Sequence, residues 1–149
     1  MSSIKVGDCI PTFKLKNQDG EWTVISPQDG KKRVLYFYPK NNTPKCNEQA
    51  CSFRDWQDDF LEQGYEVIGI SLDSPNSHLK FKAKYNLNFT LLSDPKGKVR
   101  SLFDATTFLG LLPARKTFLI NEKGEVILVY DALFEGREHV QEMLEFLKK

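Results

Sequence analysis

Residues 34–51 read Val34-Leu35-Tyr36-Phe37-Tyr38-Pro39-Lys40-Asn41-Asn42-Thr43-Pro44-Lys45-Cys46-Asn47-Glu48-Gln49-Ala50-Cys51. The first five residues form a continuous apolar run, which is typical of a strand buried on both faces. From Asn47 to about Leu61 the sequence predicts a helix that ends near Gly64. Cys46 therefore lies where a loop enters a helix. Free backbone N–H groups and the helix dipole favour a thiolate there, and the thiolate is the nucleophilic form of cysteine.

The segments on either side of this stretch alternate between strand and helix patterns. Residues 13–16 and 22–25 flank Asp19-Gly20 and predict a hairpin. Further strands are predicted at 65–72, 89–92, 117–120 and 126–130, and further helices at 74–85 and 98–103. A last helix carries one apolar face, formed by Val140, Met143, Leu144 and Leu147. This order predicts a single α/β domain over residues 1–149, with a mixed central sheet flanked by helices.

The composition is that of an ordinary globular protein. A chain of 149 residues can bury a core that needs no disulfide or metal. The formal net charge of +1 indicates neither a nucleic-acid nor a membrane partner. No apolar stretch approaches the roughly 18 residues of a membrane span, and residues 1–8 lack the apolar core of a signal peptide. We therefore expect a cytosolic (cytoplasmic) protein, in which a disulfide is typically transient and catalytic.

In a regular helix, Cys46 and Cys51 are too far apart to form a disulfide. Their Cα atoms would lie roughly 8–9 Å apart, with the two side chains separated by about 140° around the axis. A disulfide needs Cα atoms within about 7 Å. The core side of this helix is predicted to carry Cys46, Ala50, Phe53, Phe60 and Leu61. A bond between the two thiols would therefore require the first helical turns to unwind, which a helix end does more readily than a core strand.

Spacing alone leaves other interpretations of the cysteines open. A buried cysteine is commonly a small core hydrophobe, which we expect of Cys9, and for Cys46 both a core role and a functional role remain open. Two thiols are too few for a metal site, and neither His78 nor His139 is near them in sequence, so no metal is predicted. The Cys-x-x-Cys of thioredoxin is absent. The histidines also give no sign of a Cys–His hydrolase.

The pattern Pro39-x-x-x-Thr43-x-x-Cys46 resembles the active-site motif of peroxiredoxins, which are thiol peroxidases on a thioredoxin-like fold. With a second cysteine five residues later, the wider run is similar to the peroxiredoxin Q, or bacterioferritin comigratory protein, subfamily. The resemblance covers nearly the whole chain, including the stretches 6–13, 67–71, 92–95 and 112–120. The chain departs from the family at Lys45, where Gly is usual, and at Asn47, where Thr is usual. Neither position supplies a core catalytic group.

The resemblance implies a thioredoxin-like fold with an N-terminal β-hairpin, and a peroxidase mechanism. Cys46 would be the peroxidatic cysteine, which a peroxide oxidises to a sulfenic acid, and Cys51 the resolving cysteine, which forms an intramolecular disulfide with it. An external dithiol protein, thioredoxin, would reduce that disulfide, and no bound cofactor is needed. Thr43 would orient the thiolate and the peroxide, Arg115 would supply a permanent positive charge, and Pro39 would shield the thiolate.

Several alternatives remain open at this stage. A peroxide sensor that passes its disulfide to a partner protein would use the same residues. The subfamily resemblance implies a monomer. The apolar stretch Phe108-Leu109-Gly110-Leu111-Leu112 could favour organic hydroperoxides, join the core or form a dimer surface. Arg54 and Asp55 are expected to form a structural pair, although Arg54 could also approach the site.

Overall fold

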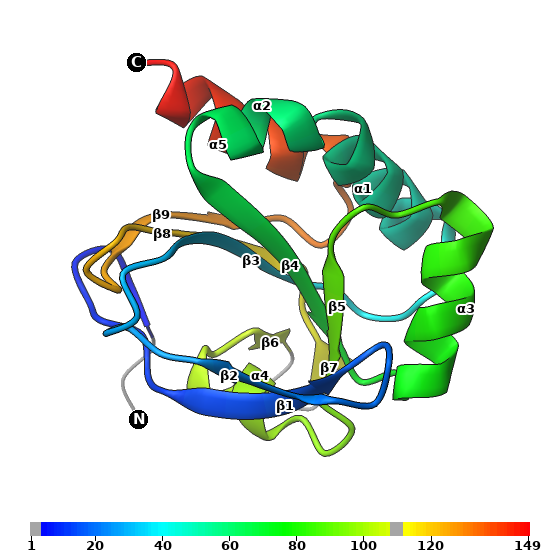
Figure 1. The fold of residues 1–149 in the computed structure, drawn as a ribbon. Coiled ribbons are helices and arrows are strands. Elements are labelled where there is room, and N and C mark those ends of the chain that lie inside the picture. The colour runs from blue at the N-terminus through cyan, green and yellow to red at the C-terminus, as the bar shows by residue number, and fades with distance from the viewer. Residues whose placement is uncertain (1–3, 108–111) are drawn as a thin grey trace.

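The computed structural model describes residues 4–107 and 112–149 and is built on a central sheet (Figure 1). Within these residues the sheet has seven strands, in the order β2-β1-β5-β4-β3-β8-β9. Their bounds are β1 Phe13–Asn17, β2 Trp22–Ile25, β3 Lys32–Phe37, β4 Tyr65–Ser71, β5 Thr90–Ser93, β8 Lys116–Ile120 and β9 Val126–Asp131. The inner strands β3, β4 and β5 run parallel, and the flanking strands pair antiparallel. The predicted mixed α/β sheet and N-terminal hairpin are confirmed.

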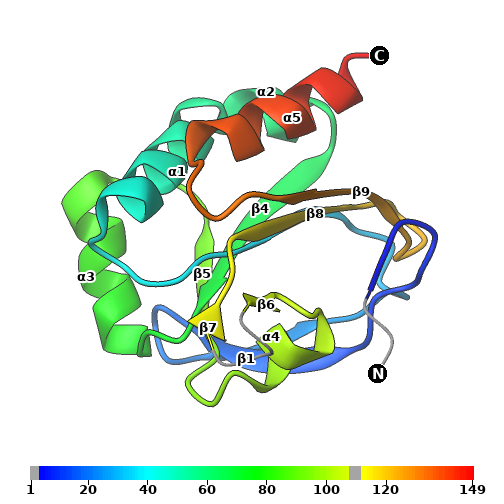
Figure 2. The same ribbon diagram turned by 180° about the vertical axis from the view of Figure 1, so that it is seen from behind.

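The helices divide between the two faces of the sheet (Figures 1 and 2). One face is covered by α1 Pro44–Asp55, α2 Gln57–Glu62, α3 Pro75–Tyr85 and α5 Arg137–Leu147. The other face packs against α4 Lys98–Leu102, near a short strand pair, β6 Thr106–Thr107 and β7 Leu112–Pro113, which was not predicted. Each face buries its own apolar cluster, so the central strands are enclosed on both sides.

Strand β3 fixes the position of α1 through aromatic packing. Its side chains alternate between the clusters, with Val34 and Tyr36 under the helices and Leu35 and Phe37 on the opposite face, and Tyr38, directly after the strand, continues the alternation. The ring of Tyr36 stacks on Phe53 of α1, with centroids 4.5 Å apart. This packing needs Gly69 opposite Tyr36 in β4, because an added Cβ would lie 2.8 Å from the tyrosine ring. The apolar run that precedes the cysteines thus orients the helix that carries them.

Most predicted elements are confirmed, but the cysteine-bearing helix differs in its bounds. It begins at Pro44 rather than Asn47 and breaks at Trp56, which has the non-helical angles φ −104° and ψ 12°. The break turns Leu61 outward, where it is 54% exposed, so its predicted place on the core side is wrong. The expectation that Cys9 is a core residue is also wrong, since its side chain is exposed.

The apolar stretch at 108–112 lies, except for its last residue, outside the described residues. Across residues 4–107 and 112–149, no helix is long and apolar enough to cross a membrane.

Candidate active site

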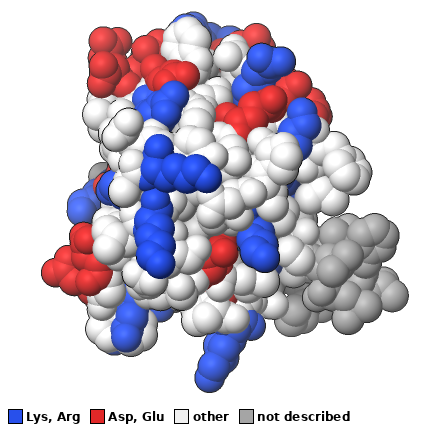
Figure 3. All heavy atoms as spheres, turned by 90° about the vertical axis from the view of Figure 1, so that its right-hand side faces the viewer, with Lys and Arg blue, Asp and Glu red and all other residues white. Residues whose placement is uncertain are grey.

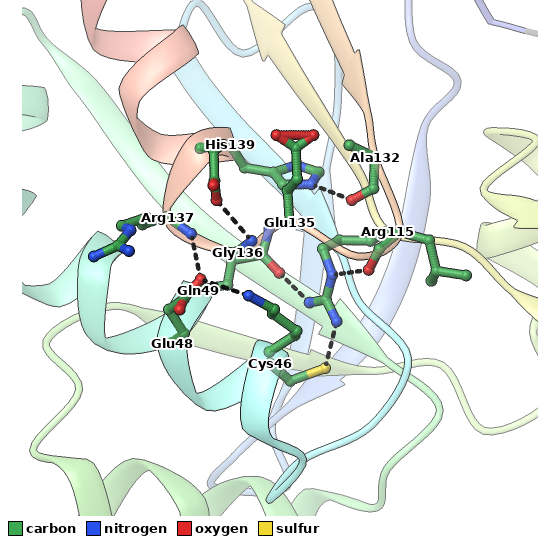
Figure 4. Close-up of polar contacts among 12 residues, drawn as sticks. Cys46, Glu48, Gln49, Arg115, Ala132, Glu135, Gly136, Arg137 and His139 are labelled. Carbon is green, nitrogen blue, oxygen red and sulfur yellow. Dashed lines mark hydrogen bonds and ion pairs between the residues drawn. The ribbon is translucent and has the colours of Figure 1, made fainter.

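Cys46 lies in the first turn of α1 and is almost fully buried, with 1% of its surface exposed. Thr43 precedes the helix in an extended conformation, and Pro44 takes the first helical position, where its missing N–H costs nothing. Cys46 therefore belongs to the turn whose backbone N–H groups have no partner within the helix. A donor reaches its sulfur from another element, because Nη2 of Arg115 lies 3.3 Å from Sγ (Figure 4).

Arg115, the residue before β8, is held by three hydrogen bonds and is 3% exposed. Its Nη2 donates to the thiol, its Nη1 donates to Oε1 of Gln49 over 2.6 Å, and its Nε donates to the carbonyl of Leu133 over 2.9 Å. Two of these acceptors are neutral oxygens. The guanidinium charge is therefore aimed at the sulfur in a fixed geometry, and a charge-assisted bond would strengthen on ionisation of the thiol.

Gln49 was missed by the sequence interpretation. It lies on the buried face of α1, three residues after Cys46, and is 0% exposed. Its Nε2 has no hydrogen-bond partner among the residues described. An uncharged polar residue on an otherwise apolar helix face was the available signal, because a buried amide needs a partner.

The segment that supplies the Leu133 carbonyl is fixed by a buried histidine. His139 Nε2 donates to the carbonyl of Ala132 over 2.8 Å, and the hydroxyl of Thr117 donates to its Nδ1 over 2.8 Å. The N–H of Ala132 in turn donates to the carbonyl of Arg115. Burial, together with the nearby positive charge of Arg115, lowers the pKa of His139 to about 4. The imidazole is therefore neutral at pH 7, and no sequence pattern indicated this role of His139.

The N-terminus of α5 packs directly on the first turn of α1 (Figure 4). Gly136 allows the approach, because a Cβ there would lie 2.6 Å from a carboxylate oxygen of Glu48 and 2.9 Å from the carbonyl of Lys45. The same oxygen of Glu48 accepts the N–H of Arg137. The turn that carries Cys46 is therefore clamped in its helical form.

A second polar network fixes the loop before the helix. Asn41, 3% exposed, accepts the Tyr38 hydroxyl over 2.6 Å, and its backbone N–H donates to Asp73 over 2.9 Å. Its side-chain amide donates to Nδ1 of His78 over 3.1 Å. Burial lowers the pKa of His78, which keeps this ring neutral as an acceptor. The loop is thus anchored to α3 and to the connection between β4 and α3 before it enters α1.

A second buried arginine lies beneath this loop. Arg100 Nη2 donates to the carbonyl of Tyr38 over 2.7 Å, at the point where β3 leads into the loop. Burial lowers its pKa to about 10. Within the described residues, its Nε and Nη1 have no hydrogen-bond partner. Sequence patterns did not indicate this residue.

The other predicted site residues lie around Cys46. Pro39 is half-buried at the start of the loop. The hydroxyl of Thr43 donates to the carbonyl of Lys40 over 3.1 Å. The structure thus brings Cys46 and Arg115 together, whereas the roles of Thr43 and Pro39 toward a peroxide stay predictions.

Cys51 is half-buried on the same unbroken helix, and the three cysteines are free thiols. Helix α1 is intact and Cys46 and Cys51 are not bonded to each other, as expected for a reduced form, and the Cys46–Cys51 disulfide stays a prediction. Arg54 pairs with Asp55 over 2.9 Å and also donates to the carbonyl of Tyr85, so the predicted structural pair is confirmed.

This architecture, a buried cysteine at a helix start facing an arginine on a thioredoxin-like sheet, defines a thiol-based redox enzyme. Residues 6–129 match the AhpC/TSA family model, and the chain belongs to that family, as a peroxiredoxin of the peroxiredoxin Q type. The chain is 43% identical over 148 residues to "Peroxiredoxin Q, chloroplastic" of Populus jackii, covering 99% of this chain and 70% of the relative. The corresponding protein of Suaeda salsa is 44% identical over 149 residues, with the same coverage of both chains.

Solved structures agree with this assignment. Peroxidoxin BcpB from Mycobacterium tuberculosis superposes with a TM-score of 0.89 at 34% identity, covering 97% of each chain. Xanthomonas campestris peroxiredoxin Q gives a TM-score of 0.83 at 30% identity, covering 91% of this chain and 89% of its own. A structure described for the alkyl peroxide reduction activity of Xanthomonas campestris bacterioferritin comigratory protein gives 0.84 at 27% identity, covering 95% of this chain and 98% of its own.

Proposed function

We propose that this thiol-dependent peroxidase reduces hydrogen peroxide and organic hydroperoxides through a Cys46 sulfenic acid and a Cys46–Cys51 disulfide, which thioredoxin recycles. The observation that carries the proposal is the 3.3 Å contact between Arg115 Nη2 and Cys46 Sγ in a buried site. The alkyl peroxide activity named for the Xanthomonas campestris relative supports organic hydroperoxides as substrates.

In the first step, the Cys46 thiolate attacks the terminal oxygen of the peroxide. An S–O bond forms and the O–O bond breaks, which leaves a sulfenic acid and an alkoxide or hydroxide that takes up a proton from water. An ordinary thiol is about 3% ionised at pH 7, so complete ionisation adds at most about 30-fold to the rate. The remaining acceleration must come from donors that stabilise charge on the breaking bond, and Arg115 is oriented for this task.

In the second step, Cys51 attacks the sulfenic sulfur, and the disulfide forms with loss of water. In the regular helix that contains both cysteines, the Cα atoms lie roughly 8–9 Å apart, beyond the reach of a disulfide. The first turns of α1 must therefore unwind, and the contact with α5 at Gly136 must open. A dithiol protein then reduces the disulfide by thiol exchange.

Charge on one face favours an acidic reductant. The face that carries α3 and the adjoining start of α1 presents Lys and Arg side chains across its middle, with Asp and Glu mostly nearer its edges (Figure 3). Complementary charge raises the association rate of two proteins.

Two variants test the proposal. Cys46→Ser should abolish peroxide consumption, whereas Cys51→Ser should keep the first oxidation and lose turnover with thioredoxin and its reductase. Full turnover by the Cys46→Ser protein would refute the proposal. Slow turnover of the wild type with abundant mixed disulfides would instead favour a relay that passes its disulfide to a partner.

Two further expectations belong to the proposal. We expect a monomer, which sedimentation of the reduced protein can check, and a cytosolic location, which fractionation of the native cells can check. The chloroplast location in the names of the Populus jackii and Suaeda salsa relatives describes those two proteins.

A further inference from the structure

A cleft lies on the α4 face of the sheet, where β1 diverges from β5. These strands pair through Lys16–Ser93 and Asn17–Leu92, at one end of β1, and residues of β1 line the cleft together with residues of the loop that leads to α4. The cleft measures about 580 Å³, within the range of about 300–1,000 Å³ found for ligand pockets. Its apolar lining consists of Phe13, Leu15, Trp22, Pro75, Pro95 and Val99.

Positive charge borders this apolar lining. Four exposed lysines stand at the cleft, with Lys14 and Lys16 on one wall and Lys96 and Lys98 on the other. The ammonium groups of Lys14 and Lys16 lie 4.6 and 5.2 Å from the ring centroid of Trp22, which is itself 59% exposed. An aromatic wall and cations on both sides suit a ligand with an apolar body and an anionic end.

The negative charge at the cleft is already engaged. Asp94 is the one acidic residue among the described lining residues, and it is 2% exposed. Its carboxylate accepts the backbone N–H groups of Val99 and Arg100 over 3.3 and 2.9 Å and so caps the start of α4. Four lysines and one aspartate leave a formal charge of +3 at the cleft.

The cleft is separate from the thiol site. Phe13, Leu15 and Val99 belong to the apolar cluster on the α4 face, whereas Cys46 belongs to the cluster under α1 and α5. The apolar floor of the cleft therefore belongs to the cluster on the face of the sheet opposite to Cys46, and Pro75 at the start of α3 also lines the cleft. Peroxide reduction makes no use of these lysines or of Trp22.

We propose that this cleft binds a free amphipathic carboxylate of the medium-chain fatty acid class. The alkyl chain lies on the apolar floor beside Trp22, and the carboxylate pairs with lysines at the border. The concave shape favours a single chain enclosed between two walls over a flat lipid surface, because it removes more apolar area from water.

Trp22 gives a direct readout that does not depend on peroxidase activity. In a Trp56→Phe protein, which retains Trp22 as the single tryptophan, titration with decanoate below its micelle concentration should change the fluorescence saturably. Decanol, which has the same chain without the charge, should bind at least about tenfold more weakly. The double substitution Lys96→Gln and Lys98→Gln should weaken decanoate about tenfold and leave decanol unchanged, since an exposed ion pair contributes up to about fivefold.

Equilibrium dialysis of decanoate against the Trp22→Phe protein provides a second readout, and circular dichroism verifies the fold of each variant. Absence of saturable decanoate binding, equal binding of decanol, or an unchanged affinity after the double lysine substitution would overturn the proposal. Binding of an acidic peptide or of phosphatidylglycerol vesicles without binding of decanoate would also overturn it, and would assign the cleft to a protein or a membrane partner.

Discussion

Acidification should destabilise the protein through His139. In the folded state its ring is neutral and both ring nitrogens are hydrogen-bonded, since Nε2 donates to the carbonyl of Ala132 and Nδ1 accepts from the hydroxyl of Thr117. Burial is the main obstacle to a charged ring, and a proton on Nδ1 would also face the Thr117 hydroxyl and the charge of Arg115, while Asp131 and Glu138 offset part of that cost. Folding therefore keeps the pKa near 4, against an ordinary value of 6.5 in the unfolded chain.

The magnitude follows from the two pKa values. Between pH 6.5 and pH 4 the unfolded chain binds a proton at His139 and the folded protein does not, so stability falls as the pH falls. From pH 7.5 to pH 5, this single group should remove about 2 kcal/mol from the free energy of unfolding, approaching about 3 kcal/mol below pH 4.

Urea unfolding of the wild type and of His139→Gln at several pH values measures this contribution. Glutamine keeps one donor and one acceptor but does not titrate, and His78 is retained in both proteins, so its own acid-linked loss cancels. Thr117→Val should raise the pKa of His139, which an NMR titration of the ring would record. Identical pH dependence of stability in the wild type and the His139→Gln protein would refute this account of the buried imidazole.

Three substitutions near Cys46 give further predictions. Arg115→Lys replaces a guanidinium that makes three hydrogen bonds with a point charge, so the first oxidation of Cys46 should slow about 10²- to 10³-fold in stopped-flow measurements. The exposed control Arg137→Lys should change this rate by less than twofold, and a decrease of less than threefold in Arg115→Lys would contradict the assigned role. Gln49→Leu leaves Nη1 of Arg115 without its acceptor in a buried site, so unfolding by urea should show a loss of about 1–3 kcal/mol, and an unchanged stability would be contrary evidence. Gly136→Ala forces the first turns of α1 and α5 apart, so it should lower the free energy of unfolding by about 1–3 kcal/mol. It should also speed formation of the Cys46–Cys51 disulfide after one equivalent of peroxide, and slower formation would argue that α5 does not hold the first turn of α1 in place.

The elements predicted well are those whose determinants are local. Strands β3 and β4 are enclosed on both faces and appear as continuous apolar runs. Ser74 and Pro75 mark the start of α3 because the serine hydroxyl accepts the N–H of Ser77, within one turn of the chain. The break at Trp56 lies between two helical patterns that follow each other without a proline or glycine, so no local signal separated them.

The site could be predicted only in part, because most of its contacts join distant segments. The family motif indicated Cys46 and Arg115, which are 69 residues apart in the chain. Gln49 is hydrogen-bonded to Arg115, 66 positions away, and one of the two hydrogen bonds of His139 joins it to Thr117, 22 positions away. A polar residue on an apolar helix face does not reveal such a distant partner. The backbone of Cys9 forms an isolated antiparallel β-bridge with that of Glu125, and its side chain is exposed. Sequence spacing cannot distinguish such an exposed thiol from a core thiol.

Cys46 and Cys51 should react with each other only when the start of α1 unwinds. Amide hydrogen exchange of residues 44–51, measured on the reduced protein and after one equivalent of peroxide, tests it directly, with Cys51→Ser as the control that cannot form the disulfide. Protection of these amides should fall in the oxidised wild type, together with the appearance of the Cys46–Cys51 disulfide in mass spectra, and should persist in the control. A Cys46–Cys51 disulfide formed with full protection of these amides would contradict the claim.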